Sequence, residues 1–240
     1  MIRLDSWIVE NGLAESSDKA RALIMAGDVL INGQRADKAG LPVPLDARVE
    51  VRPKLRYVGR GGLKLEAALA RFAISVGGTV CADIGTSTGG FTDCLLQHGA
   101  ARVHAVDTGA GQIDWRLRSD PRVVLHEGFN ARYLELATLG EPVDLVVCDV
   151  SFISATVIIP AIVRVLKPGT GQLVILVKPQ FEVARGQVGE GGIVRDPALH
   201  EAVCAKVRAC VEESEFTTEI MESPITGTEG NKEFLLHGRR

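Results

Sequence analysis

The chain of 240 residues is 46% hydrophobic and carries a net charge of −3. This length allows one large domain or two smaller ones, and the charge gives no overall basic signature of nucleic-acid binding. The charge is unevenly placed, because residues 1–60 hold ten Lys/Arg against eight Asp/Glu. Six basic residues form a stripe between positions 48 and 64: Arg48, Arg52, Lys54, Arg56, Arg60 and Lys64. It suits nucleic-acid phosphates or an ordinary solvated linker equally well.

The five cysteines include no Cys-x-x-Cys pair and are odd in number, which predicts neither a disulfide framework nor a structural zinc site. Cys81 and Cys148 lie in apolar runs and read as core thiols. Arg3 and Asp5 make the amino terminus too charged for a signal peptide. No apolar run reaches the roughly 18–20 residues that cross a bilayer. We therefore expect a soluble, cytoplasmic protein without a membrane partner.

Residues 1–53 predict a small α+β module. An apolar helical stripe begins at Leu4 and ends at Gly12. Ser16 or Ser17 caps a second helix, and Gly27 follows its last turn. We then expect, in order, a strand at 29–34 that runs into an Asn-Gly turn, a loop at 41–45, a half-exposed strand at 48–52, and Pro53 as the end of the module.

After a linker at 54–62, residues 63–240 alternate between helix and strand patterns. The predicted strands are 80–84, 102–107, 122–126, 143–149, 171–178, 216–222 and 232–237, with helices at 63–72, 89–98, 155–166 and 197–213. Such alternation predicts a parallel sheet with helices on both faces. The last two strands must pair antiparallel, because the Pro224–Gly230 loop is too short for the crossover of about a dozen residues that parallel neighbours need.

A glycine turn follows the first of these strands, in the sequence Asp83-Ile84-Gly85-Thr86-Ser87-Thr88-Gly89-Gly90-Phe91. Glycine allows a sharp turn and a close ligand. The spacing is neither a dinucleotide fingerprint nor a P-loop. Asp107 ends the next strand, a natural place for a carboxylate that holds ribose hydroxyls, and the missing phosphate-binding features favour S-adenosylmethionine over NAD. Asp83 equally suits a partner of the helix amino terminus, and Asp107 and Asn130 equally suit caps.

Lysines and carboxylates form the second candidate cluster. Asp149 and Lys178 each end an apolar run, and the carboxyl ends of parallel strands are where ligand and catalytic groups gather. Together with Lys64 and Glu233, they provide two amines and two acids that activate a hydroxyl without a metal. Burial and Lys64 favour the neutral amine of Lys178, whereas the acids favour its ammonium form, and the sequence leaves the balance open. The alternative is a buried salt-bridge cluster with no chemistry.

These features together resemble the TlyA family, the haemolysin-named ribosomal RNA 2′-O-methyltransferases, over essentially the whole chain. Residues 1–53 are similar to the S-four RNA-binding domain at 3–5, 14–16, 19–24, 27 and 29–33. Residues 63–240 look like the FtsJ-type methyltransferase fold, a Rossmann-like sheet with an antiparallel last strand, and residues 85–92 match its cofactor loop. The shorter branch of the family, which this chain resembles, implies a cytidine of large-subunit 23S rRNA as target.

The resemblance assigns site residues. It implies a catalytic tetrad of Lys64, Asp149, Lys178 and Glu233. It implies S-adenosylmethionine binding by Asp83, Gly85, Thr86, Ser87, Thr88, Gly89, Gly90, Phe91, Asp107, Asn130 and Asp149. We expect Arg3, Lys19, Arg21, Arg52, Lys54, Arg56 and Arg60 to bind RNA, with the ribosomal subunit as partner and no metal.

Other function classes fit the sequence less well. An amino-methyltransferase has Pro-Pro-aromatic after the fourth strand, where this chain has Asp149-Val150-Ser151-Phe152. A cytosine-carbon methyltransferase needs a cysteine nucleophile, but Cys148 should point into the sheet, because alternate strand residues face opposite ways. A non-catalytic ribosome-assembly protein is the best non-enzyme alternative. A haemolytic pore has no amphipathic or apolar segment to support it.

Overall fold

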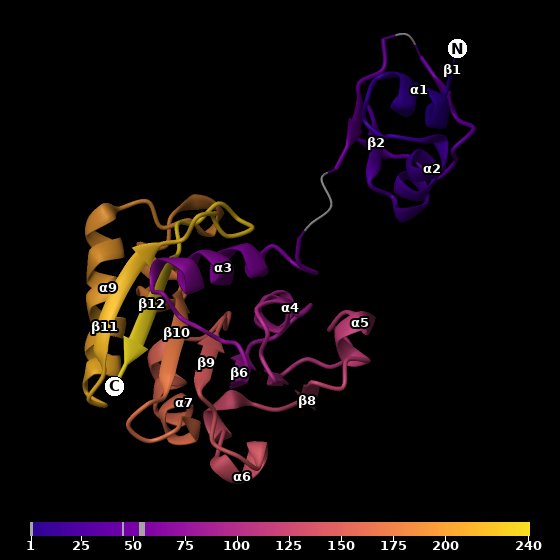
Figure 1. Cartoon of the computed structure of the whole chain (residues 1–240). Coiled ribbons are helices and arrows are strands. Elements are labelled where there is room, and N and C mark those ends of the chain that lie inside the picture. Colours follow the sequence, from indigo (N-terminus) through magenta and orange to yellow (C-terminus); the bar gives the residue numbers. More distant parts are fainter. Residues whose placement is uncertain (1, 45, 53–55) are drawn as a thin grey trace. The chain divides into compact units, whose positions relative to one another are not determined.

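The chain forms two compact units, Met1–Leu55 and Arg56–Arg240 (Figure 1). The computed structural model describes residues 2–44, 46–52 and 56–240. The expected end of the first module at Pro53, the start of the linker with its basic residue Lys54, and the last residue of the expected 41–45 loop lie outside the described residues.

The smaller unit packs two helices against short strands. Its helices are α1 (Leu4–Glu10) and α2 (Ser17–Ala26), and Ser16 caps α2 by accepting a hydrogen bond from the backbone N–H of Lys19. Leu4, Ile8 and Ile24 are fully buried between the helices and strands. The two predicted helices are therefore confirmed, because their apolar residues recur on one face.

The strands of this unit form two small sheets. The first contains β3 (Gln34–Arg35), β2 (Val29–Ile31) and β5 (Val49–Val51), with the predicted Asn-Gly turn between β2 and β3, where Asn32 and Gly33 have φ of 51° and 80°. The second pairs β1 (Ile2–Arg3) with β4 (Pro42–Val43). The prediction of a loop at 41–45 was therefore wrong at 42–43, since a two-residue edge strand tolerates proline.

The larger unit is built on a seven-stranded sheet in the order β11-β12-β10-β9-β6-β7-β8. Figure 1 labels β11, β12, β10, β9, β6 and β8 in this order from left to right. The strands are β6 (Val80–Ile84), β7 (Arg102–Asp107), β8 (Val123–Glu127), β9 (Leu145–Cys148), β10 (Gln172–Val177), β11 (Thr217–Glu222) and β12 (Phe234–Arg239). The pairs among β6 to β10 are parallel, and β12 is antiparallel to both β10 and β11. The predicted α/β sheet with an antiparallel last strand is confirmed.

Helices cover both faces of this sheet. One core contains residues of α3 (Gly61–Arg71), α4 (Gly90–Gln97) and α5 (Trp115–Arg118). The other contains residues of α6 (Leu136–Leu139), α7 (Ile159–Val165) and α9 (Pro197–Glu212). Short turns of helix add α8 (Pro179–Glu182), η1 (Ala131–Tyr133), η2 (Ala155–Val157), η3 (Arg185–Gln187) and η4 (Glu190–Gly192). Strands β9 and β10 are almost wholly apolar, because both faces of the sheet are covered there.

Residues 56–60, within the predicted linker, pack on the larger unit. The backbone N–H of Val58 donates to Asp93 Oδ2 at 2.8 Å, and Gln97 Nε2 donates to the Arg56 carbonyl at 3.0 Å. The Tyr57 ring is buried so tightly against Gly62 that a Cβ there would lie 2.3 Å from it. These contacts fix the entry into α3, the helix that carries Lys64.

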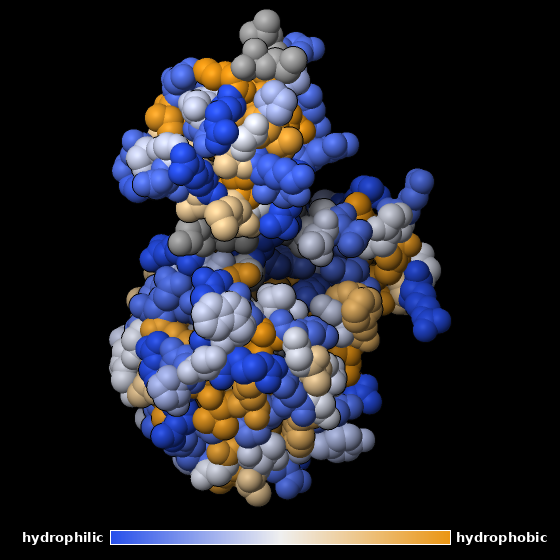
Figure 2. Space-filling model, turned by 90° about the vertical axis from the view of Figure 1, so that its right-hand side faces the viewer, coloured by the Kyte–Doolittle hydropathy of each residue, from blue (hydrophilic) through white to orange (hydrophobic). Residues whose placement is uncertain are grey.

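Figure 2 shows hydrophilic and hydrophobic residues interspersed on the visible face of each unit. The most exposed large hydrophobic side chains include Phe152, Trp115 and Tyr133.

Among the described residues, no helix combines the length and apolar character needed to span a membrane. All five cysteines are free thiols, and Cys81 and Cys148 are buried as expected.

Candidate active site

One edge of the sheet collects three of the four predicted catalytic residues. The parallel strands β9 and β10 both end there, and β12 begins there, with Val177 opposite Phe234. Asp149 directly follows β9, Lys178 follows β10, and Glu233 precedes β12. Strand register alone therefore places these side chains on neighbouring strands, as expected for ligand sites of open α/β sheets.

Lys178 contacts two groups of the segment that follows β9. Its Nζ lies 2.5 Å from Asp149 Oδ1 and donates a hydrogen bond to Ser151 Oγ at 2.7 Å. The Lys178 side chain is only 11% exposed, so both contacts form with little competition from water. Ser151 was not among the predicted site residues. Its only signal in the sequence is its position two residues after Asp149.

Lys64 and Glu233 form a second, more deeply buried ion pair. Lys64 Nζ donates to Glu233 Oε2 at 2.5 Å, and the two side chains are 9% and 3% exposed. The helix α3 brings Lys64 to the sheet edge, and a Cβ on Gly61, one turn earlier, would lie 3.8 Å from Asp149 Oδ2. The structure thus brings all four predicted residues to one edge, as two lysine–carboxylate pairs.

The glycine turn after β6 lies at the same edge and lines two adjoining cavities. The larger, of about 570 Å³, has the size typical of small-ligand sites. The smaller, of about 220 Å³, reaches Lys178. Residues lining both are Gly85, Ser87, Asp149 and Ser151; the larger adds Asp107, Asn130 and residues 150–153, and the smaller adds Arg60, Thr86, Thr88, Gly90 and Phe91.

Gly85 is required by the close approach of two chain segments. Its φ is 84°, and a Cβ there would lie 2.4 Å from the carbonyl oxygen of Asp149. Only glycine satisfies both conditions without displacing the backbone. The turn and the start of the Asp149 segment are therefore in direct contact, which couples the cavity to the lysine pairs.

Asp107 and Asn130 line the larger cavity and also hold the backbone. The Asp107 carboxylate accepts from the N–H groups of Ser87 and Gly109, both at 2.7 Å. Asn130 Oδ1 accepts from the N–H of Arg132 at 3.1 Å. The capping alternative is therefore present for Asn130, which caps η1, whereas Asp107 holds the loop N–H groups of Ser87 and Gly109 and caps no helix of the described residues.

Two predicted cofactor residues do not line either cavity. Asp83 is fully buried, and its Oδ2 accepts from the backbone N–H and the hydroxyl of Thr92 at 3.0 and 2.7 Å. Burial raises the pKa of Asp83 to about 7. The geometry matches the alternative in which Asp83 holds the amino terminus of α4. Gly89 instead packs against Leu117, since a Cβ there would lie 2.3 Å from that side chain.

The predicted RNA-binding residues in the described segments are exposed, and most have acidic neighbours. In the smaller unit, Arg3 and Arg21 approach the buried Asp5 carboxylate at 2.9 and 3.3 Å. The hydrogen bond from Arg3 is the main cause that lowers the pKa of Asp5 to about 2. The remaining contacts join Lys19 to Glu15, Arg56 to Glu66 and Arg60 to the Thr226 carbonyl. Arg52 is exposed as well.

Lys64, in contrast, is buried, so it does not contribute to an exposed basic stripe.

Comparison with known proteins places the two units. Residues 57–240 match the FtsJ-like methyltransferase family, and residues 2–49 match the S4 domain. The larger unit is therefore a Rossmann-like methyltransferase. A candidate rRNA methyltransferase of Bacillus subtilis, YqxC, is 48% identical over 98% of this chain and 84% of its own. The 16S/23S rRNA (cytidine-2′-O)-methyltransferase TlyA of Mycobacterium tuberculosis is 46% identical over 98% of this chain and 88% of its own.

A solved structure is similar over the whole length of this chain. A candidate hemolysin from Streptococcus thermophilus is 45% identical, with a TM-score of 0.76 over 100% of this chain and 88% of that chain. This chain belongs to the TlyA family, which joins an S4 domain to an FtsJ-like methyltransferase domain.

Proposed function

We propose that this protein transfers a methyl group from S-adenosylmethionine to a ribose 2′-oxygen of ribosomal RNA. The observation that carries the proposal is the pair of buried lysine–carboxylate contacts beside the glycine-turn cavity. The relatives named as rRNA methyltransferases support the substrate class. The smaller unit, as an S4 domain, supplies a surface for RNA.

The cavity fits S-adenosylmethionine. The volume of the cavity is suitable for a small ligand. Gly85 lines it without a side chain, and Asp107 lines it at the end of β7, where an acid holds ribose hydroxyls. When bound, the cofactor supplies an electrophilic methyl group on a sulfonium. We assign its binding to the turn residues 85–88 and 90–91 with Asp107, Asn130 and Asp149, and we assign Asp83 and Gly89 an indirect role.

Lys178 is placed to act on the attacking hydroxyl. Asp149 and Ser151 hold its Nζ at the smaller cavity, where the ammonium form stabilises the negative charge that develops on the 2′-oxygen and the neutral amine form accepts the hydroxyl proton. Lys64 and Glu233 lie behind this pair and do not line either cavity. Their role is to fix the electrostatic environment of Lys178. Most of the rate gain then comes from positioning.

The surface of the S4 unit suits RNA phosphates. Arg3 and Arg21 are both held by Asp5, which fixes two guanidinium groups next to each other while leaving each more than half exposed. Guanidinium groups bind phosphates through paired donors. We therefore assign Arg3, Lys19, Arg21 and Arg52 of this unit to phosphate contacts. We assign Arg56 and Arg60, at the start of the larger unit, to the same role. Lys54 stays a sequence-based prediction.

Two rival reactions find less support. Carbon methylation through Cys148 requires a thiolate, but the side chain is 1% exposed and burial raises its pKa to about 12. Amino methylation is not supported, because this chain lacks the two prolines that amino-methyltransferases have after the strand equivalent to β9. The M. tuberculosis relative is named for both 16S and 23S rRNA, so the restriction to a cytidine of the large subunit stays a prediction.

The decisive experiment is incubation of unmethylated small and large ribosomal subunits with the purified protein and labelled S-adenosylmethionine. We expect label on a single ribose 2′-oxygen, mapped by primer extension at low nucleotide concentration and by mass spectrometry of nuclease fragments. Cofactor binding without label transfer to either subunit would favour the non-catalytic assembly role. Label on a base would contradict the proposed 2′-oxygen chemistry.

A further inference from the structure

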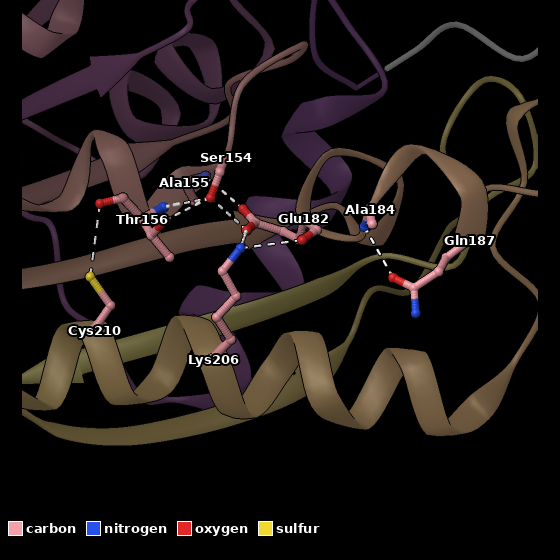
Figure 3. Close-up of polar contacts among 8 residues, drawn as sticks. All are labelled: Ser154, Ala155, Thr156, Glu182, Ala184, Gln187, Lys206 and Cys210. Atoms are coloured by element: carbon pink, nitrogen blue, oxygen red, sulfur yellow. Dashed lines mark hydrogen bonds and ion pairs between the residues drawn. The ribbon is translucent and has the colours of Figure 1, made fainter.

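Glu182 is a buried carboxylate close to the lysine pairs that the proposed reaction does not use. It ends α8, four residues after Lys178, and its side chain is 2% exposed. Figure 3 shows it between the segment at 154–156 and helix α9. A carboxylate removed from water in this way needs strong donors, and it is retained in a core only where those donors are fixed.

Three donors satisfy the Glu182 carboxylate. Oε2 accepts from Ser154 Oγ at 2.6 Å and from Lys206 Nζ at 2.9 Å, and Oε1 accepts from the backbone N–H of Ala155 at 2.6 Å. Lys206 also donates to the Glu182 carbonyl at 3.2 Å. One side chain thus connects α8, helix α9 and the far end of the segment that begins at Asp149.

That segment contains a strained residue. Phe152 has φ of 64°, which residues with a Cβ rarely adopt, and its side chain is 91% exposed, so burial of the ring does not stabilise the conformation. Its ring is tilted against the Phe181 ring, with the two centroids 5.2 Å apart. A strained backbone of this kind persists only where surrounding contacts hold it.

Contacts on both sides of Phe152 join the same two segments. Before it, Ser151 accepts a hydrogen bond from Lys178; after it, Ser154 and Ala155 donate to Glu182. Residues 150–153, which include the two between these contacts, line the larger cavity. The segment is therefore held against the Lys178–Glu182 stretch at two points, and Glu182 provides the second.

We propose that Glu182 is a positioning residue that holds segment 150–155 in its strained conformation, so that Asp149 and Ser151 keep Lys178 in place at the cavity. The proposal rests on the methyl-transfer function assigned above. Without the Glu182 contacts, the segment loses its second attachment and relaxes toward ordinary backbone angles. Misplacement of a reacting group by about 1 Å costs roughly a hundredfold in rate.

The test variant is Glu182→Gln, which keeps the side-chain shape but replaces one acceptor oxygen by a donor. That donor must face Ser154, Ala155 or Lys206, so at least one contact is lost. Ser154→Ala removes the hydroxyl donor to Glu182, together with the hydrogen bond that Ser154 Oγ accepts from the Thr156 N–H, and gives a second, milder variant that keeps the carboxylate. The control is Glu141→Gln. Like Glu182, Glu141 accepts a hydrogen bond from a cation, Arg102, and it has a second partner in His104, but it does not line either cavity.

Two measurements are made on each full-length variant. In hydrogen–deuterium exchange without substrate, we expect the amides of 150–155 to exchange about tenfold faster in Glu182→Gln, with α4 and β7 unchanged. In methylation of ribosomal subunits, we expect kcat to fall by roughly tenfold to a hundredfold, because the segment that holds Lys178 is displaced. Ser154→Ala should move both readouts in the same direction by less, and Glu141→Gln should move neither.

Unchanged exchange at 150–155, or unchanged kcat, in Glu182→Gln would overturn the positioning role. Faster exchange across the whole larger unit would assign Glu182 to fold stability alone and would also overturn it. The exchange measurement does not depend on methyl transfer. Failure of the wild-type protein to methylate RNA would therefore count against the proposed function, while local exchange would still decide whether Glu182 holds the segment.

Discussion

Lys64 Nζ and Glu233 Oε2 lie 2.5 Å apart, although the two residues are separated by 169 positions in the sequence. Lys64 comes from α3, the first helix of the larger unit, and Glu233 from the residue before its last strand. Both side chains are less than one tenth exposed. The pair therefore closes the larger unit at the active edge, where the first and last elements meet.

Breaking this pair should destabilise the protein. Glu233→Gln leaves the Lys64 ammonium buried without a counter-charge, and we expect a loss of about 3–5 kcal/mol in the free energy of unfolding, measured by urea titration. The double variant Lys64→Met, Glu233→Gln removes both charges and should regain most of this loss while remaining inactive. A single variant within about 1 kcal/mol of wild type would show that the ammonium finds another partner or water.

Lys178→Ala should stop methyl transfer and leave cofactor binding intact. Lys178 contacts Asp149 and Ser151 at the smaller cavity, whereas the larger cavity is lined by the glycine turn and Asp107. We expect kcat to fall by at least about a hundredfold and the Kd for S-adenosylmethionine, measured by calorimetry, to change little. Lys167→Ala is the control, since Lys167 pairs with Asp144 at 2.6 Å outside both cavities. Normal turnover of Lys178→Ala would refute its assignment.

Gly85→Ala should abolish binding of S-adenosylmethionine. The new Cβ would lie 2.4 Å from the Asp149 carbonyl, so either the turn or the Asp149 segment must move. Gly140→Ala separates this clash from backbone strain, because Gly140 has a similar φ of 80° and no atom within 4 Å of its Cβ position. Both variants should lose stability, by about 1 kcal/mol for Gly140→Ala. Only Gly85→Ala should lose cofactor affinity, and retained affinity would contradict the coupling of turn and segment.

The free energy of unfolding should decrease as the pH rises, because the carboxyl of Asp83 loses its proton. Burial raises the pKa of this group to about 7 from 3.8, so between those values the folded state holds a proton that the unfolded state has released. Its contribution is complete below pH ~4 and is lost as pH rises to ~7. Asp83→Asn copies the protonated form and should gain stability relative to wild type between pH 5 and pH 8.

The control for that experiment is Asp114→Asn. The hydrogen bonds from Arg116 lower the pKa of Asp114, so it is ionised in both states across this range and should add no pH dependence. Denaturant titrations at pH 5, 6, 7 and 8 give the comparison. A difference between Asp83→Asn and wild type that is the same at every pH would show that the carboxyl of Asp83 is ionised throughout.

RNA binding by the S4 unit should depend strongly on salt. If Arg21 contacts a phosphate, Arg21→Ala should weaken binding to ribosomal RNA and reduce the slope of log K against log salt by about 1. Arg71→Ala is the control, as Arg71 lies on the methyltransferase unit beside Glu219. Filter-binding titrations between low and high salt measure the slope. Affinity that does not vary with salt would contradict docking through phosphates.

Local sequence patterns predicted most of the secondary structure. Apolar periodicity and caps gave α2 with Ser16 at its start, and the Asn32-Gly33 pair gave the β2–β3 turn. The 155–166 helix was predicted as one element, but the structure has η2 followed by α7, since Pro160 is accommodated at the first turn of α7 and not within a longer helix. The strand at 42–43 was missed because it exists only through its pairing with β1.

The candidate site was predicted unevenly for a similar reason. Asp149 and Lys178 could be found because each ends an apolar strand, and strand ends are visible in the sequence. Ser151 and Glu182 could not, because their importance depends on contacts with Lys178 and Ser154 across 27 and 28 positions. Asp83 was placed correctly within the strand 80–84, but its side chain accepts hydrogen bonds from Thr92 and does not line either cavity.

The sequence by itself determined the alternation of strands and helices, the glycine turn and the residue types at the strand ends, because these depend on periodicity and on backbone freedom at single positions. Tertiary structure decided which charges are paired and buried. The sequence placed Lys64 both in a basic stripe and in the tetrad that the family resemblance implies, and only the folding of α3 against β12 removes it from water and pairs it with Glu233. Ion pairing and burial depend on distances between remote segments, and no local pattern encodes those distances.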